Sequence, residues 1–236
     1  MNSNEIQQLL LAQADEQKAI DLARFFKTGK GQYGENDKFM GITVPKVRAV
    51  ARLAMDLPLA EVSKLLHSQW HEMRLCGLLI LTLKCRREVS REVFDFYLAH
   101  TKYINNWDLV DLSAPQIIGG YLIDKPRSVL DKLAESSSLW ENRIAMVATY
   151  TFIKANDLDE TYRLATLLMH HSHDLMHKAV GWMLREAGKR DKQRLYDYVE
   201  LHRLKMPRTM LRYAIEKFDS ETRKWLMRKD KAIVSK

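Results

Sequence analysis

The sequence has little glycine and proline for its length. Only nine glycines and five prolines occur among its 236 residues. These residues form most of the tight turns of a many-stranded sheet, so their scarcity argues against an all-β fold and favours long helices joined by short links. Four of the nine glycines lie in residues 28–41, which we expect to be the main loop of the protein.

Cysteines and long apolar runs are also scarce. The two cysteines, Cys76 and Cys85, lie in one apolar stretch, and we expect them to be reduced thiols in the core of a cytosolic protein. No apolar run reaches the roughly 20 residues that span a bilayer. The first 18 residues lack the basic start and apolar block of a secretory signal. We therefore expect a soluble, cytoplasmic protein that does not act at a membrane.

Two segments that suggest small ligands lack the residues to bind them. His173 and His177 have the i, i+4 spacing of metal ligands, but no cysteine or further acid completes a set, so we expect no metal. The glycine-rich segment GKGQYGENDK does not follow the phosphate-binding loop pattern, so we expect no nucleotide cofactor.

Basic residues outnumber acidic ones. Lysine and arginine total 38 against 30 aspartates and glutamates, which gives a net charge of +8. A basic surface suits a polyanion such as nucleic acid, although many basic proteins bind no polyanion. Charge alone therefore leaves the partner open.

Beyond residue 57 the sequence repeats itself. The unit is a polar link, a bulky residue, a charged residue and an apolar helix. Aligning the charged residues gives spacings of 37, 32, 35 and 34 residues between Arg74, Asp111, Arg143, Lys178 and Arg212. A second set of helices is predicted between them, at residues 91–100, 128–136, 158–170 and 193–203. Two helices in each repeat of this length are typical of an α-solenoid.

We therefore predict an all-α, HEAT-like repeat solenoid, because the TPR and ankyrin consensus patterns are absent. Such repeats bury their apolar faces by stacking into a curved superhelix with one concave face. We expect a single domain over residues 1–236. It would contain N-terminal helices at 3–57, repeats at about 58–225 and a basic tail at 226–236. Within the N-terminal part, helical periodicity covers residues 3–28, and a new helix is predicted at 42–57, with Thr43 as its N-cap and Pro45 in its first turn.

Four of the five aligned charged positions are cationic. Equivalent positions on stacked repeats lie along one surface, where a phosphate backbone could pass. The alternative is that each cation marks the solvated edge of its helix. Asp111 is the exception to the cationic pattern, and its neighbourhood needs a separate explanation.

The segment NNWDLVDLSAP contains two aspartates with different expected roles. If Asn106 caps the helix, Asp108 lies in the first turn, where free N–H groups and the helix dipole favour a carboxylate, and it needs no other function. Asp111 lies beyond that turn and shares a helix face with Trp107, four residues earlier. Pro115 follows four residues later and predicts a kink or break in the helix.

Three other tryptophans lie in predicted repeat helices. Trp182 follows Gly181, and a glycine inside a helix indicates the close approach of another element. Arg185 follows Trp182 by three residues. Trp70 and Trp140 begin repeats, and we expect them to pack in the core.

Four blocks carry a resemblance to a known family. They are NNWDLVDLSAP, LWENRIAM, HKAVGWMLRE and MPRTMLRYAI, and in this order and spacing they resemble the bacterial AlkD-like DNA glycosylases of DNA alkylation repair. The resemblance covers nearly the whole chain. It implies a HEAT-like fold and hydrolysis of the N-glycosidic bond of cationic alkylated purines, chiefly N3-alkyladenine and N7-alkylguanine, in duplex DNA.

The resemblance also implies roles for individual residues. Asp111 matches the catalytic aspartate, Trp107 its companion tryptophan and Trp182 a second tryptophan of the same cleft. Arg143 matches an arginine that supports the site and the DNA backbone. Phe25 stands where the best-known member has tyrosine, so a hydroxyl is missing. The further DNA contacts that we expect are Arg74, Lys178, Arg185, Arg208 and Arg212.

Two alternatives to an enzyme remain open. One is a DNA-binding relative without turnover, and the other is a protein-interaction scaffold, a common use of α-solenoids. Under the enzyme hypothesis we expect a monomer that binds double-stranded DNA containing alkylated purines, without a cofactor.

Overall fold

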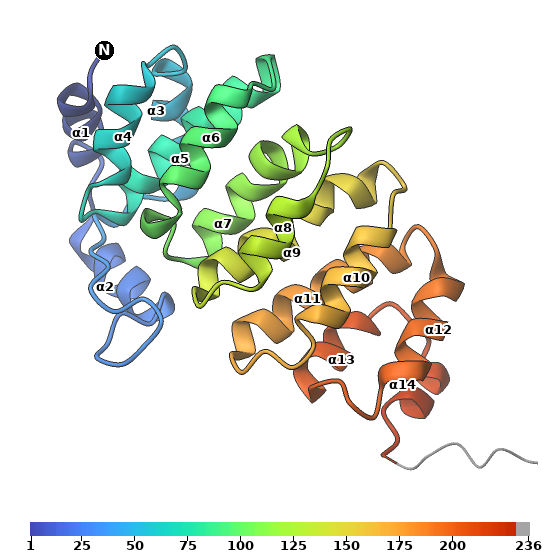
Figure 1. The fold of residues 1–236 in the computed structure, drawn as a ribbon. Helices are drawn as coiled ribbons and strands as arrows, with labels where there is room; N and C mark the ends of the chain where they lie inside the picture. Colours follow the sequence, from blue (N-terminus) through green and yellow to red (C-terminus); the bar gives the residue numbers. More distant parts are fainter. Residues whose placement is uncertain (230–236) are drawn as a thin grey trace, which may run out of the picture. The chain divides into compact units, whose positions relative to one another are not determined.

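The computed structural model describes residues 1–229, and every regular element in this part of the chain is a helix (Figure 1). The prediction of an all-α chain built from helix pairs is confirmed. The chain divides into two compact units, Met1–Lys125 and Pro126–Lys236, which we call the N-terminal and C-terminal units. Residues 230–236, most of the predicted basic tail, lie outside the described part.

The N-terminal unit is built around one buried helix. It contains α1 (Ser3–Leu11), α2 (Glu16–Phe25), α3 (Val44–Leu53), α4 (Leu59–Leu66), α5 (His71–Arg87), α6 (Arg91–Ala99), the 3-10 turn η1 (Thr101–Tyr103), α7 (Trp107–Ala114) and the π-helical turn η2 (Pro115–Gly119). Helix α5 is buried on all sides along most of its length, because α3, α4 and α7 pack against it.

The helical periodicity over residues 3–28 corresponds to two helices. The chain turns between α1 and α2, where the backbone N–H of Asp15 donates to the Met40 carbonyl at 2.9 Å. The Asp15 side chain then caps α2 by accepting a hydrogen bond from the Lys18 N–H at 2.9 Å. The apolar residues follow a helical pattern on both sides of this break, so the capping residue Asp15 was the sequence feature that indicated a second helix.

The C-terminal unit continues the pattern of helix pairs. Its elements are α8 (Ser128–Ala134), α9 (Leu139–Lys154), α10 (Asp159–Leu167), α11 (Asp174–Gly188), α12 (Lys192–His202), α13 (Arg208–Ala214) and α14 (Ser220–Leu226). Its core is formed where α9 and α13 pack against α11. All nine helices predicted from the repeat beyond residue 57 are therefore present in the described part of the chain, α5 to α13.

Pro115 ends the regular part of its helix, as predicted. Helix α7 stops at Ala114, and the next five residues form the π-helical turn η2. Proline lacks the N–H that would donate to the carbonyl of Asp111, so the α-helical hydrogen-bond ladder cannot continue through it. The chain stays helical through η2, but its backbone hydrogen bonds join residues five apart instead of four.

Gly181 allows two helices of the C-terminal unit to approach closely, also as predicted. A Cβ atom at this position would lie 2.5 Å from the Met210 carbonyl oxygen and 2.5 Å from the Tyr213 Cβ atom. Helix α13 is therefore the element that requires glycine in α11.

Cys76 and Cys85 are free and buried, which agrees with the predicted place in the core. Burial raises the pKa of Cys76 to about 12 and that of Cys85 to about 11, so both are unreactive at neutral pH. Within residues 1–229, no helix combines the length and apolar character needed to cross a bilayer.

Candidate functional site

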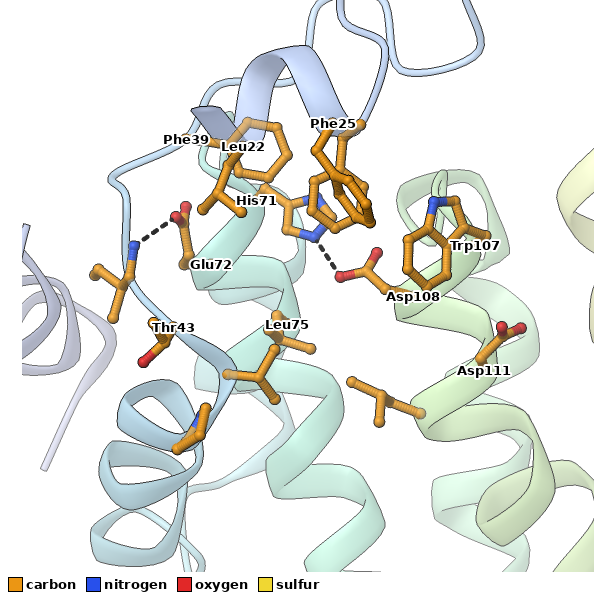
Figure 2. A pocket seen from close by; sticks show the side chains of 15 residues that line it. Leu22, Phe25, Phe39, Thr43, His71, Glu72, Leu75, Trp107, Asp108 and Asp111 are labelled. Atoms are coloured by element: carbon orange, nitrogen blue, oxygen red, sulfur yellow. Dashed lines mark hydrogen bonds and ion pairs between the residues drawn. The ribbon is translucent and has the colours of Figure 1, made fainter. Parts of the chain in front are cut away.

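A pocket of about 480 Å³ lies within the N-terminal unit, between α2, α3, α5 and α7 (Figure 2). Its walls are mainly apolar and aromatic. The lining residues are Leu22, Phe25, Phe26, Phe39, Ile42, Thr43, Val44, Pro45, His71, Glu72, Leu75, Trp107, Asp108, Asp111 and Leu112. The structure thus brings three predicted site residues, Phe25, Trp107 and Asp111, to one pocket.

Asp111 and Trp107 share a face of α7. Figure 2 shows the Asp111 carboxylate beneath the indole, whereas Asp108 turns the other way, toward His71. Both Asp111 and Trp107 are half-buried, so each keeps a solvent-facing edge at the pocket. This arrangement places an anion beside an aromatic ring, which favours a cationic ligand.

Aromatic rings cluster around Trp107. Phe26 stacks on it with ring centroids 5.3 Å apart, and Phe25 meets it edge-on at 5.9 Å. Phe25 is 61% exposed, which is unusual for a large apolar side chain. It therefore presents an open aromatic surface at the pocket. As a phenylalanine it offers no hydroxyl to a ligand there.

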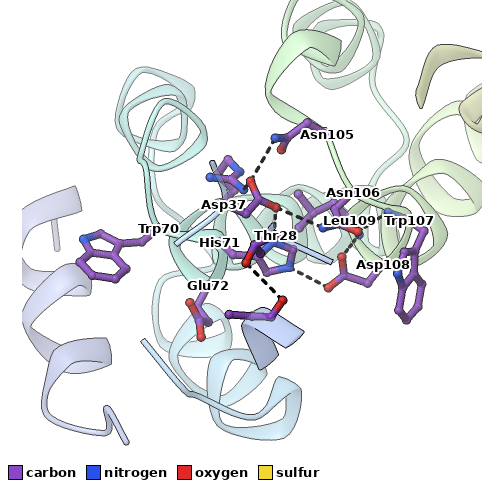
Figure 3. Close-up of polar contacts among 12 residues, drawn as sticks. Thr28, Asp37, Trp70, His71, Glu72, Asn105, Asn106, Trp107, Asp108 and Leu109 are labelled. Atoms are coloured by element: carbon purple, nitrogen blue, oxygen red, sulfur yellow. Dashed lines mark hydrogen bonds and ion pairs between the residues drawn. The ribbon is translucent and has the colours of Figure 1, made fainter. Parts of the chain in front are cut away.

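Asp108 lies in the first turn of α7, as predicted, and also makes a buried contact that the sequence did not indicate. Its Oδ2 atom lies 2.8 Å from His71 Nε2, and both side chains are buried (Figure 3). The other ring nitrogen, Nδ1, lies 3.3 Å from Asp37 Oδ2. Asp37 comes from the glycine-rich segment, so His71 joins that segment to α7.

Asp37 is the centre of this buried network. It accepts hydrogen bonds from Arg74 Nη2 at 2.6 Å and from the side-chain amides of Asn105 and Asn106 at 3.1 Å each. Burial alone would raise the pKa of Asp37, but the hydrogen bond from His71 and the charge of Arg74 lower it below its usual value. Asp37 is thus a carboxylate despite its burial.

His71 is the cationic partner of both carboxylates. Burial favours the neutral imidazole, but the charge of Asp108 and its hydrogen bond outweigh this and raise the pKa of His71 to about 9. With Arg74, the network contains two cations and two anions, so it is electrically balanced in the interior.

Arg74 does not lie on a DNA-facing surface, so its prediction as a DNA contact is wrong. The residue is 4% exposed, and its guanidinium donates to Asp37 and to the Ser68 carbonyl. The repeat alignment could not reveal its partner, because Asp37 precedes it by 37 residues in a loop.

Glu72 is a second buried acid of the pocket that the sequence did not indicate. Its carboxylate accepts hydrogen bonds from the backbone N–H groups of Met40, Gly41 and Ile42, at 2.9–3.1 Å. It thereby fixes the chain segment that leads into α3 and forms one wall of the pocket.

The remaining predicted residues lie in the C-terminal unit. Trp182 is half-buried in α11, with its ring 6.0 Å from that of Tyr150. Arg143 is 5% exposed and donates to the Leu175 carbonyl at 2.7 Å. Its burial contradicts a place in a row of exposed cations, and its hydrogen bond joins α9 to α11, whereas the role in supporting the site stays a prediction.

Two more predicted DNA contacts are held by protein groups. Arg185 forms an ion pair with Glu216, and Arg208 donates to the Met227 carbonyl at 2.7 Å. Lys178 is half-exposed and pairs with Asp174 at 2.9 Å. Arg212 is exposed and has no ion pair within the described residues. The prediction that equivalent repeat positions form a row of exposed cations is therefore wrong at Arg74 and Arg143.

Trp70 and Trp140 are half-buried, so the prediction that they pack in the core is only partly met.

His173 and His177 contact nearby backbone groups. His173 Nδ1 accepts from the Leu175 N–H at 3.1 Å, and His177 Nε2 lies 2.6 Å from the His171 carbonyl oxygen. Within residues 1–229 there is no group of three or more His, Cys, Asp or Glu side chains that could hold a metal ion.

Comparisons with known proteins point to one family. A family model described as DNA alkylation repair enzyme matches residues 6–218. A solved structure described as a predicted DNA alkylation repair enzyme from Enterococcus faecalis has the same fold, with a TM-score of 0.71 and 16% sequence identity over 88% of this chain and 98% of that one. No curated protein matches the sequence.

Proposed function

The chain belongs to the family of DNA alkylation repair enzymes, and we propose that it is a DNA glycosylase that removes cationic alkylated purines from duplex DNA. One observation carries this proposal: Asp111 and Trp107 share a face of α7 at the edge of a largely apolar pocket. A carboxylate beside an aromatic ring suits a substrate that is positively charged or becomes so during the reaction.

The proposed chemistry needs only one carboxylate. An N3-alkyladenine or N7-alkylguanine base already carries a positive charge and leaves without being protonated, so no general acid is required. The sugar then becomes oxocarbenium-like, and the negative charge of Asp111 would stabilise it and orient the attacking water. A carboxylate near apolar walls stabilises a positive charge more strongly than a carboxylate in bulk solvent does.

Trp107 and Phe25 would contribute aromatic surface on the substrate side of Asp111. Their rings are 5.9 Å apart and both line the pocket. Because Phe25 has no hydroxyl, its contribution would be apolar contact only. Trp182 lies in the C-terminal unit, and its role stays a prediction from the family resemblance.

DNA binding would rely on the exposed cations. Among the predicted contacts, Arg212 is exposed and Lys178 is half-exposed beside Asp174, and the net charge of the chain is +8. Phosphate contacts release condensed counterions, so affinity for duplex DNA should fall steeply with added salt. A protein-interaction scaffold would not show this dependence on a DNA ligand.

The decisive experiment measures release of 7-methylguanine from methylated duplex DNA by the wild type and by Asp111→Asn. The substitution keeps the size of the side chain and removes its charge, and we expect a loss of about 100-fold or more. Asp56→Asn is the matched control, because Asp56 is an exposed aspartate of the same unit that lies outside the pocket.

The same experiment separates the alternatives. Wild-type binding to duplex DNA without release would identify a binding protein rather than an enzyme. Release that is equal in the wild type and Asp111→Asn would remove Asp111 from the mechanism. Loss in both Asp111→Asn and Asp56→Asn would mean that the assay reports folding rather than chemistry.

A further inference from the structure

His71 occupies an unusual position for a histidine. It is the first residue of α5, is 2% exposed, and has a carboxylate oxygen beside each ring nitrogen. A neutral imidazole has a single N–H and can donate to only one of these carboxylates. An imidazolium can donate to both Asp37 and Asp108 at once, so this geometry favours the charged ring.

The first link from His71 to the pocket runs through the backbone of α7. Asp108 directly follows Trp107, so the 2.8 Å contact from His71 holds the residue after the tryptophan. Asn106 directly precedes Trp107, accepts a hydrogen bond from its N–H at 2.8 Å, and donates to Asp37 at 3.1 Å. Both neighbours of Trp107 are thus tied to the charged network around His71.

The second link runs through the aromatic rings. The His71 ring stacks on Phe39 with centroids 4.6 Å apart and lies 5.0 Å from Phe26. Phe26 in turn stacks on Trp107 at 5.3 Å. An imidazolium is attracted to such ring faces, so its charge contributes to the position of Phe26 and, through it, of the indole.

We infer that His71 is a positioning residue that sets the orientation of Trp107 and of the first turn of α7 at the pocket. The consequence for base release rests on the proposed function, whereas the consequence for Trp107 does not. Asp111 lies one turn further along the same helix, so a displaced first turn would move the carboxylate as well.

Four charged groups lie around His71. Asp37 belongs to the glycine-rich segment and Asp108 to α7, and both are in contact with the ring. Arg74 lies one turn along α5 and is directed to Asp37. Glu72, the next residue, is engaged with the backbone N–H groups of residues 40–42. A change of charge on His71 would therefore be felt first by Asp37 and Asp108.

The first test needs no substrate. The full-length protein would be labelled with 5-fluorotryptophan and followed by ¹⁹F NMR, and the Trp107 resonance would be assigned by its absence in Trp107→Phe. Because the pKa of His71 is raised to about 9, the Trp107 resonance should titrate with a midpoint near that value. Trp225 is an internal reference, because its ring lies against two arginines, which do not titrate there, and its hydrogen-bond partner Tyr196 has a pKa raised above its usual value of 10.

His71→Gln should abolish this titration and shift the Trp107 resonance at every pH. His67→Gln, which alters an exposed histidine of the same unit, should leave the titration unchanged. A Trp107 resonance that does not respond to pH in the wild type, or that responds in the same way in His71→Gln, would overturn the inference.

Asp108→Asn provides a second variant in case His71→Gln does not fold. Asp108 is the main group that favours the charged imidazole, so its neutralisation should move the midpoint of the Trp107 titration to lower pH. An unmoved midpoint would also overturn the inference.

The second test measures base release in a single turnover. We expect His71→Gln to release 7-methylguanine about 10-fold more slowly or worse, because the reacting groups are displaced, while its affinity for abasic duplex DNA changes by no more than about threefold. Release at the wild-type rate despite a shifted Trp107 resonance would refute the catalytic consequence. If the wild type releases no base, the proposed function fails, and the NMR titration still decides the role of His71.

Discussion

Helices α7 and α11 begin equivalent repeats, and each carries a tryptophan of the predicted site, but the two are held in different ways. Helix α7 has only eight residues before η2 takes over, and its start is bound to buried charges. Helix α11 runs without interruption for 15 residues and packs closely on α13 at Gly181. One helix is positioned by electrostatics and the other by shape.

The comparison shows that equivalent repeat positions do not imply equivalent physics. A short helix gains little from its own hydrogen bonds, because nucleation is costly, and so it depends on contacts from outside. Charged contacts change with protonation, whereas steric contacts change with side-chain volume. The surroundings of Trp107 should therefore respond to charge and pH, and those of Trp182 to volume.

The largest expected effect comes from removing one charge of the buried network. Asp37→Asn leaves Arg74 and His71 with a single carboxylate, and an unbalanced charge in the interior should cost about 3–5 kcal/mol in the free energy of unfolding. Urea denaturation followed by circular dichroism would measure this loss.

Glu35→Gln is the matched control for that substitution. Glu35 lies in the same glycine-rich segment, but its carboxylate accepts an exposed hydrogen bond from the Gly31 N–H. Its neutralisation should change the free energy of unfolding by less than about 1 kcal/mol. If both variants lost the same small amount, the network would not stabilise α7.

The next effect is a loss of stability at alkaline pH. The pKa of His71 is about 9 in the folded protein against 6.5 for an ordinary histidine, so its stabilisation is fully present below pH 6.5 and is lost as the pH rises through about 9. The difference corresponds to about 3 kcal/mol at most. Urea denaturation on both sides of this range would detect the loss, and His71→Gln should lack it.

The fold and half of the site could be predicted because their signals are local. Helix periodicity, the repeat spacing and the i, i+4 pair of Trp107 and Asp111 are all visible within one turn or one repeat. Gly181 was informative because glycine is costly in a helix.

The network could not be predicted, because its contacts join distant segments. Asp37 reaches His71 across 34 residues and Asp108 reaches it across 37. The segment that contains Asp37 has no periodicity that would place it against α5. For the same reason Arg74 appeared to be a surface cation, although it is the buried partner of this aspartate.

The smallest of these effects tests the steric half of the comparison. Gly181→Ala places a Cβ atom 2.5 Å from the Met210 carbonyl oxygen, so α11 and α13 must separate, and we expect a loss of about 1–3 kcal/mol in the free energy of unfolding. Gly120→Ala is the matched control at the end of η2, where a Cβ atom would meet nothing closer than 3.9 Å.

Helix propensity alone favours alanine over glycine, so Gly120→Ala should be neutral or stabilising by up to about 1 kcal/mol. In ¹⁹F NMR, Gly181→Ala should shift the resonance of Trp182, the next residue along α11, at all pH values equally, because the substitution changes volume and not charge. If Gly181→Ala were as stable as Gly120→Ala, close packing on α13 would not be what holds α11, and the contrast with α7 would have to be explained by helix length alone.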